Sequence, residues 1–114
     1  MRMEIRAGQI YFAKTQLGKA NYKRPILILH VYPSQNEVDI CMFSTKFDLI
    51  ESNDLTINEL DPEFSKTGLK ESSYLIFRSV KTLPLSHFLD AEYRGSVTGS
   101  IKNQIENWWG TPLK

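Results

Sequence analysis

Short apolar stretches separated by polar turns run through most of the chain, and this pattern predicts strands rather than long helices. The strongest stretch is 26–31, Ile-Leu-Ile-Leu-His-Val, which is nearly all apolar and is typical of a strand buried on both faces. Arg24 and Pro25 come directly before it, and proline is tolerated at the start of a strand, where its missing N–H costs least. We therefore expect this strand to be central, with Arg24 held at its beginning.

A turn at 33–36 and a stretch of alternating polar and apolar residues at 37–43 follow, which together predict an antiparallel hairpin. The second strand of the hairpin delivers residues 44–46 just past its end. In an antiparallel pair, the start of one strand lies beside the end of its partner. The hairpin alone therefore predicts that Arg24 and Thr45 are neighbours in space.

The other elements are short. We expect further strands at 8–14, 54–57, 73–78, 79–83 and 93–97, a loop at 15–23 and a helical turn at 85–89. Thr98 is a suitable N-cap for a final helix that Gly110 and Pro112 terminate. Its apolar stripe consists of Ile101, Ile105, Trp108 and Trp109. These elements predict a mainly β domain with a C-terminal helix, a small antiparallel barrel in one domain over 1–114.

Charge is distributed unevenly along the chain. The formal net charge is only +1, but residues 1–24 carry six Lys or Arg and one acid, whereas residues 25–71 carry three bases and nine acids. Residues 72–114 return to a net charge of +2. A basic beginning and an acidic middle can give a surface of two signs, although solvated faces of no special function would produce the same pattern.

Composition and motifs exclude several classes of function. The single cysteine, Cys41, rules out an intramolecular disulfide and fits a reducing, cytoplasmic location. No stretch approaches the roughly 18 apolar residues of a membrane span. Phosphate-loop, GxGxxG and HExxH motifs are absent, and the carboxylates of 48–63 lack the spacing of a calcium loop. We expect His30 and His87 to be packing or surface residues rather than a paired acid–base site, and we expect neither a metal nor a cofactor.

Six segments of the chain, in order, resemble the MazF/PemK family of toxins from bacterial toxin–antitoxin pairs. They are 6–12 (Arg-Ala-Gly-Gln-Ile-Tyr-Phe), 24–29 (Arg-Pro-Ile-Leu-Ile-Leu), 41–45 (Cys-Met-Phe-Ser-Thr), 68–75 (Gly-Leu-Lys-Glu-Ser-Ser-Tyr-Leu), 80–83 (Val-Lys-Thr-Leu) and 95–98 (Gly-Ser-Val-Thr). The resemblance covers roughly residues 6–109. Each segment is weak alone, but the shared order makes the set informative.

The resemblance implies a small SH3-like barrel of the CcdB/MazF type, usually a homodimer, that cleaves single-stranded RNA at short sequence motifs without a metal or cofactor. It also implies a cognate antitoxin protein as inhibitor. By analogy, Arg24 matches the family's catalytic arginine and Thr45 its catalytic threonine. The residues that we expect by the same analogy to contact RNA are Lys19, Lys23, Ser44, Lys46 and Ser73.

The chemistry of RNA cleavage explains why an arginine and a threonine would suit such a site. Attack by the adjacent 2′-hydroxyl passes through a crowded phosphorane that carries extra negative charge. A guanidinium offers a planar fork of donors that suits phosphate oxygens and stays charged at neutral pH, so Arg24 is suited to stabilising that charge. The hydroxyl of Thr45 can donate a further hydrogen bond. Arginine is a poor general base at its ordinary pKa.

Two departures from the family pattern leave alternatives open. The family's Gly-Ser-Glu-Gln-x-Gly loop is replaced by Gly-Lys-Ala-Asn-Tyr-Lys at 18–23, and its acid–glutamine pair by Arg78-Ser79. An inactive or repurposed member of the same fold is therefore one alternative. Another is a non-catalytic poison of DNA gyrase, because 101–110, which ends in Trp109 and Gly110, is similar to the tail of CcdB. Tryptophans on an apolar helix face also serve simply as packing residues.

Overall fold

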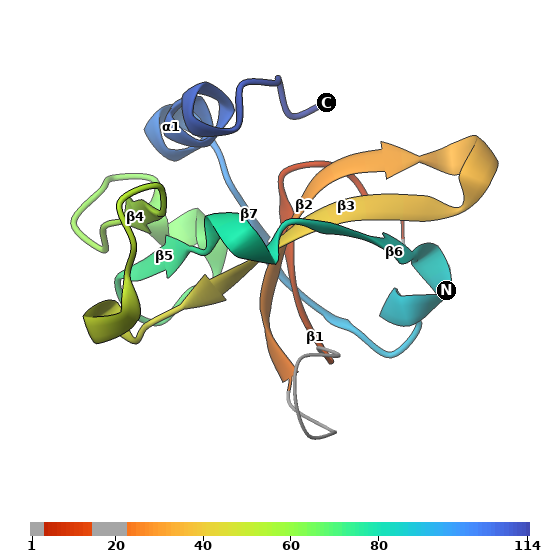
Figure 1. The fold of residues 1–114 in the computed structure, drawn as a ribbon, viewed down its shortest axis with the longest axis horizontal. Helices are drawn as coiled ribbons and strands as arrows, with labels where there is room; N and C mark the ends of the chain where they lie inside the picture. The colour runs from red at the N-terminus through yellow and green to blue at the C-terminus, as the bar shows by residue number, and fades with distance from the viewer. Residues whose placement is uncertain (1–3, 15–22) are drawn as a thin grey trace.

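Seven strands and one α-helix, joined by short 3₁₀ turns, make up the part of the chain that this computed structural model describes, residues 4–14 and 23–114. The strands are β1 (Gln9–Lys14), β2 (Lys23–Tyr32), β3 (Glu37–Ser44), β4 (Leu55–Ile57), β5 (Ser73–Leu75), β6 (Lys81–Pro84) and β7 (Glu92–Ser96), and the helix is α1 (Gly99–Trp109). Figure 1 shows α1 beside the end of the sheet that contains β4 and β5. None of the described helices is long and apolar enough to cross a membrane.

The β2–β3 hairpin is the longest paired unit and is antiparallel, which confirms the prediction. A single 3₁₀ turn, Pro33–Gln35, connects the two strands. Asn36 closes this turn in the left-handed conformation, at φ 54°, which asparagine tolerates better than most residues, and its N–H donates to the carbonyl of Pro33. One residue of β2 bulges between Ile28 and His30, so the register shifts there by one position.

The sheet curls because β3 changes partners along its length. Its first part pairs with β2 on one side and with β6 on the other, whereas Phe43 and Ser44 at its end pair with Leu75 and Tyr74 of β5. The strand order is β4-β5-β3-β2-β1-β7, every pairing is antiparallel, and β6 lies off this path beside β3. The result is a curled half-barrel with one C-terminal helix, as the mainly β prediction requires.

Strand β2 is apolar throughout its middle because it packs against two clusters, one on each face of the sheet. Leu27 and Leu29 belong to a cluster that includes Ile101 of α1, whereas Ile26 and Ile28 belong to a cluster under Phe88. Successive side chains of a strand point to opposite faces, so both faces must be apolar. Burying each such side chain contributes about 1.5–3 kcal/mol relative to exposure.

Helix α1 begins and ends as the sequence predicts, but its first residue is held differently. Thr98 occupies the N-cap position, yet its Oγ1 donates to Oε1 of Glu63, 3.0 Å away, and makes no capping bond. The carboxylate of Glu63 lies against Gly99, so an acid faces the positive end of the helix. Gly110 ends the helix at φ 84°. The predicted stripe is buried at Ile101 and Ile105 and partly buried at both tryptophans.

The strand predicted over 73–78 is too long, because β5 ends at Leu75. A 3₁₀ turn, Phe77–Ser79, follows instead. The hydroxyl of Ser79 stabilises the turn by donating to the carbonyl of Ile76 at 2.7 Å and by accepting the N–H of Met42 at 2.8 Å. A side-chain oxygen thus takes the place that a backbone carbonyl would hold in a longer strand.

Candidate functional site

A cleft opens where β2 and β3 separate. Their pairing ends at Ile26 and Met42, and the next residue of β3, Phe43, is paired on the other edge of β3, with Leu75 of β5. Pro25 lies on β2 at this point and has no N–H to offer a neighbouring strand, which suits it to the place where pairing ends. The gap is a cavity of about 160 Å³ lined by Arg24, Pro25, Phe43, Ser44, Thr45, Lys46 and Ser73.

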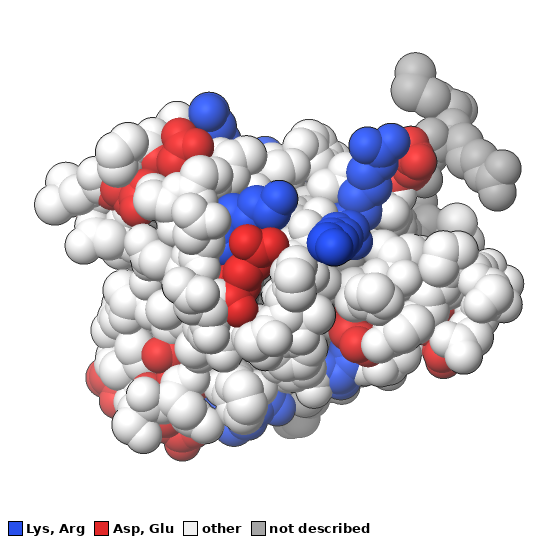
Figure 2. Space-filling model, turned by 90° about the horizontal axis from the view of Figure 1, so that it is seen from above, with Lys and Arg blue, Asp and Glu red and all other residues white. Residues whose placement is uncertain are grey.

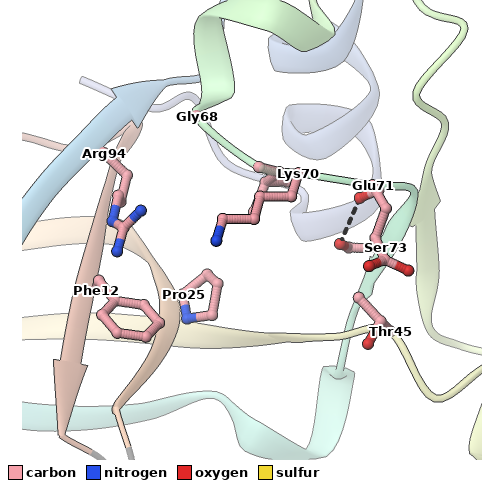
Figure 3. Close-up of a pocket in the computed structure, with 9 residues that line it drawn as sticks. Phe12, Pro25, Thr45, Gly68, Lys70, Glu71, Ser73 and Arg94 are labelled. Carbon is pink, nitrogen blue, oxygen red and sulfur yellow. Dashed lines mark hydrogen bonds between the residues drawn. The ribbon is translucent and has the colours of Figure 1, made fainter.

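A second, larger cavity of about 210 Å³ continues from the first, and Pro25, Thr45 and Ser73 line both. Its other walls come from β1, β7 and the segment between Gly68 and β5 (Figure 3). The residues that line only this cavity are Phe12, Gly68, Leu69, Lys70, Glu71 and Arg94. The two cavities together are called the cleft below.

Arg24 and Thr45 lie together in the smaller cavity, as the hairpin register predicts. Arg24 is the second residue of β2, is half-buried, and pairs across the sheet with the buried Ala13 of β1. Thr45 is exposed and follows directly after β3. The arginine is therefore anchored in the sheet, while the threonine presents its side chain from the strand end.

Three hydrogen bonds fix the backbone around Thr45. The N–H of Lys46 donates to Oγ of Ser44 at 3.1 Å, and the hydroxyl of Tyr74 donates to the carbonyl of Lys46 at 3.0 Å. The N–H of Phe47 donates to the carbonyl of Thr45 itself, and the Phe47 ring packs against Tyr74 with ring centres 5.2 Å apart. Tyr74 thus holds the backbone beside Thr45 in place. This contact follows from the position of Tyr74 opposite Ser44 in the sheet, which the sequence alone does not give.

The other residues predicted to contact RNA divide into three groups. Ser44, Lys46 and Ser73 line the smaller cavity, and Ser73 is buried and donates to the carbonyl of Glu71. Lys23 is the exposed first residue of β2 and does not line either cavity. Lys19, together with most of the predicted loop at 15–23, lies outside the described residues.

Arg94 and its neighbours are the functional candidates that sequence reasoning missed. The guanidinium carbon of Arg94 lies 4.5 Å from the ring centre of Phe12, which is a cation–π contact. Its Nε lies 3.5 Å from Oε1 of Glu92 as an ion pair, but it is buried and has no hydrogen-bond partner among the described residues. Lys70 faces Arg94 from the other wall (Figure 3). Strands β1 and β7 are about 80 residues apart in sequence, so no local pattern indicates this pairing.

Two glycines bring the wall with Lys70 close to β7. Gly68 has φ +74°, and a Cβ there would lie 2.1 Å from the carbonyl oxygen of Arg94. A Cβ on Gly95 would likewise lie 2.3 Å from the carbonyl oxygen of Lys66. The backbones touch at both points, so the position of the segment after Gly68 is set directly by β7.

The cleft is basic although the chain is nearly neutral. Among the residues that the structure describes, four cationic side chains and one carboxylate, Glu71, line its two cavities; the cations are Arg24, Lys46, Lys70 and Arg94. Figure 2, which views the molecule from the top of Figure 1, shows positive and negative side chains interspersed on a mostly uncharged face. A concave site lined mainly by one sign of charge attracts ligands of the opposite sign. The arrangement therefore suits an extended anionic ligand.

The cysteine and the histidines lie elsewhere. Cys41 is fully buried, and burial raises the pKa of its thiol to about 12, so it is not a thiolate nucleophile near neutral pH. His30 packs edge-on against Tyr32, and Nε2 of His87 contacts the carbonyl of Lys14. Within residues 4–14 and 23–114, no cluster of three or more His, Cys, Asp and Glu side chains is arranged to hold a metal ion.

Trp108 and Trp109, which belong to the segment similar to the CcdB tail, make packing contacts. Nε1 of Trp108 donates to the carbonyl of Asn53 at 2.7 Å, and its ring lies edge-on to Phe77. Trp109 packs against the core cluster that contains Ile101. These contacts fit the interpretation of both residues as packing residues of α1.

Comparison with known proteins identifies the fold. No protein-family model matches the chain, and no curated protein sequence matches it. Among solved structures, the chain is similar to the Mycobacterium tuberculosis toxin MazF-mt6, with 16% sequence identity and a TM-score of 0.59, over 92% of this chain and 99% of that chain. The predicted fold is therefore confirmed: the chain has the curled antiparallel sheet and C-terminal helix of a MazF-like toxin.

Proposed function

We propose that this protein is a MazF-like endoribonuclease toxin that cleaves single-stranded RNA without a metal ion. The observation that carries the proposal is the presence of Arg24 and Thr45 in one basic cavity at a strand end, in a chain with the MazF toxin fold. The cleft is long enough to have two connected cavities, as an extended polyanion requires, and its lining is mainly cationic. These features favour a nucleic-acid substrate over a small neutral molecule.

In the proposed reaction, the 2′-oxygen of one nucleotide attacks the adjacent phosphorus. A bond forms between the 2′-oxygen and phosphorus, and the bond between phosphorus and the 5′-oxygen breaks, which leaves a 2′,3′-cyclic phosphate and a 5′-hydroxyl. The attacking hydroxyl releases its proton to water, and the departing 5′-oxygen takes one up. Negative charge on the non-bridging oxygens rises in the transition state, so the best catalyst is a fixed donor at those oxygens.

Arg24 is the residue proposed to meet that charge. Its backbone is held in β2 by pairing with Ala13, and its side chain lines the smaller cavity, so the guanidinium is within the cleft where the phosphate is proposed to bind. The hydroxyl of Thr45 supplies a second donor from a backbone that Ser44 and Tyr74 fix. Lys46 and Ser73 are proposed to contact the flanking RNA.

The test is cleavage of a mixed-sequence single-stranded RNA in EDTA by the wild-type protein and by Arg24→Ala and Thr45→Ala variants. Loss of one preorganised donor is worth roughly 3–4 kcal/mol, so we expect each variant to lose about 10²–10³-fold in kcat. The matched control is Arg6→Ala, which removes an exposed arginine that lines neither cavity. Unchanged circular dichroism would show that the variants fold, and full activity of Arg24→Ala would refute the proposal.

Two partners belong to the same proposal, an antitoxin and a second copy of this chain. The basic cleft supports inhibition by an antitoxin whose acidic segment occupies it, in the compartment where RNA is found, the cytoplasm. Calorimetric titration with the product of an adjacent small gene should show affinity that falls steeply with salt. Affinity independent of salt would contradict occupation of the cleft, and a single-chain mass in solution would contradict a homodimer.

A further inference from the structure

Arg94 is held more firmly than a surface arginine usually is. The ring of Phe12 supports its guanidinium, Glu92 lies 3.5 Å from its Nε, and the side chain is only 29% exposed. These contacts use one face and one edge of the guanidinium, while the side chain still lines the larger cavity. A planar fork that is already oriented loses little entropy when it binds a phosphate or carboxylate.

Lys70 lies opposite this arginine in the larger cavity. Its side chain extends from the wall after Gly68 toward the side of the cavity where Arg94 lies (Figure 3). Lys70 forms no ion pair with any residue in the described part of the chain. Among the described residues that line this cavity, Glu71 is the only carboxylate, and it lies on the side of Thr45 and Ser73. Both cations that line the larger cavity therefore lie at its Arg94–Lys70 end, where Glu92, which does not line the cavity, offsets part of the charge of Arg94.

We propose that the space between Arg94 and Lys70 is a second phosphate subsite, which holds a backbone phosphate of the RNA beyond the one that is cleaved. The inference rests on the proposed function and extends it. The two cavities share Pro25, Thr45 and Ser73, so a strand that passes Arg24 continues directly into the larger cavity. RNA carries a phosphate on every nucleotide and can fill two anion sites along one groove, which a single anionic group cannot.

Phosphate rather than a base is the group assigned to this subsite. The face of Phe12 that would stack a base is covered by the guanidinium of Arg94. Two cations that converge on one space favour a full negative charge, and arginine in particular binds phosphate oxygens through two parallel hydrogen bonds. The subsite would therefore bind RNA with little regard to sequence and would set its position relative to Arg24.

The experiment measures binding of a fluorescent, mixed-sequence 2′-O-methyl oligoribonucleotide, which has phosphates but lacks the attacking 2′-hydroxyl. Arg94→Gln and Lys70→Gln are each expected to weaken binding about tenfold at 0.15 M salt. The slope of log affinity against log salt should fall by about 0.7 in each variant and by about 1.4 in the double variant. The matched control, Lys81→Gln, removes a lysine of β6 that lines neither cavity and should change nothing.

Conservative and kinetic controls separate phosphate binding from support of the fold. Arg94→Lys keeps the charge and should keep most of the salt slope, whereas a purely structural arginine would give equal losses in the Lys and Gln variants. On cleavable RNA, Arg94→Gln and Lys70→Gln should raise KM and leave kcat within about twofold. A fall in kcat at saturating RNA would overturn the assignment as a binding subsite. Lys70 is exposed, so its variant tests the site without a risk to folding.

Other outcomes distinguish failure of this inference from failure of the proposed function. If the wild-type protein neither binds nor cleaves RNA, the proposed function and the subsite fail together. If the wild-type protein cleaves RNA but Arg94→Gln and Lys70→Gln bind it with unchanged affinity and salt slope, only the subsite fails. If these variants keep RNA binding but lose binding of polyglutamate, the site recognises peptide carboxylates and the phosphate assignment is overturned.

Discussion

Replacement of Gly68 by alanine tests how the cleft wall is built. Gly68 has φ +74°, a region that L-residues rarely adopt, and its added Cβ would lie 2.1 Å from the carbonyl oxygen and 2.7 Å from the carbonyl carbon of Arg94. Both atoms belong to the backbone of β7, which cannot rotate away as a flexible side chain can. The wall must therefore retreat by more than 1 Å before the contact reaches the roughly 3.4 Å at which ordinary van der Waals contact begins.

Two other glycines allow the two contributions to this loss of stability, left-handed strain and overpacking, to be measured separately. Gly110 has φ +84° and nothing within 4 Å of an added Cβ, so Gly110→Ala should cost only the left-handed strain, about 1–2 kcal/mol. Gly95 lacks a left-handed φ but lies against Lys66, so Gly95→Ala should cost only the overpacking, about 1–3 kcal/mol. Gly68→Ala combines both and should cost about 2–5 kcal/mol, a large share of the roughly 5–15 kcal/mol that stabilises such a domain.

The measurement is urea denaturation of the three variants, followed by tryptophan fluorescence and circular dichroism. We expect the loss in free energy of unfolding to be largest for Gly68→Ala, and oligoribonucleotide binding to weaken in Gly68→Ala but not in Gly110→Ala, because the wall with Lys70 moves away from Arg94. If Gly68→Ala is no less stable than Gly110→Ala, the backbone contact with β7 does not exist as described. Gly95→Ala tests the same contact without left-handed strain should Gly68→Ala fail to fold.

Two predictions concern titratable groups. Cys41, whose thiol pKa is raised to about 12 by burial, should resist Ellman's reagent at pH 8 in the folded protein and react in urea; rapid reaction of the folded protein would contradict its burial. The pKa of Asp61 is lowered from 3.8 by hydrogen bonds from the N–H of Glu63 and the hydroxyl of Ser100, so its ionised form stabilises the fold above about pH 4. Asp61→Asn should therefore lower the free energy of unfolding at pH 7, with a difference that shrinks as pH falls through the folded pKa, and an equal difference at pH 3 would contradict this.

The sequence predicts the meeting of Arg24 and Thr45 because that meeting depends only on local signals. The antiparallel pair is defined by an apolar run, a turn with proline and asparagine, and a second, alternating run. The pair in turn places the start of its first strand beside the end of its second strand. The bulge of β2 between Ile28 and His30 shifts the register by one residue, which no pattern in the sequence indicates. This shift does not separate Arg24 from Thr45, because a cavity of about 160 Å³ accommodates side chains from several successive positions.

The Arg94 side of the cleft could not be predicted in the same way. Phe12 and Arg94 meet because β1 pairs with β7 across most of the chain, and this pairing also has a register shift, between Ile10 and Tyr11. Lys70 joins them only because Gly68 touches the backbone of β7. Contacts between segments so far apart in sequence depend on the complete tertiary fold, whereas hydrophobic periodicity reports only which face of an element is buried.

Two residues shape the cleft through a chemical group that they lack: Pro25 has no backbone N–H, and Gly68 has no side chain. Pro25 lacks an N–H, so β2 has no donor to offer at the point where its pairing with β3 ends, and Arg24 and Thr45 line the cavity beyond that point. Gly68 lacks a side chain, so the wall that carries Lys70 can touch the backbone of β7, and the larger cavity takes its shape there. The missing N–H of Pro25 and the missing side chain of Gly68 thus leave one cation each, Arg24 and Lys70, beside the same cleft. The spacing of the two proposed anion sites is therefore set by backbone geometry, which explains how a chain with a net charge of only +1 can present a basic cleft.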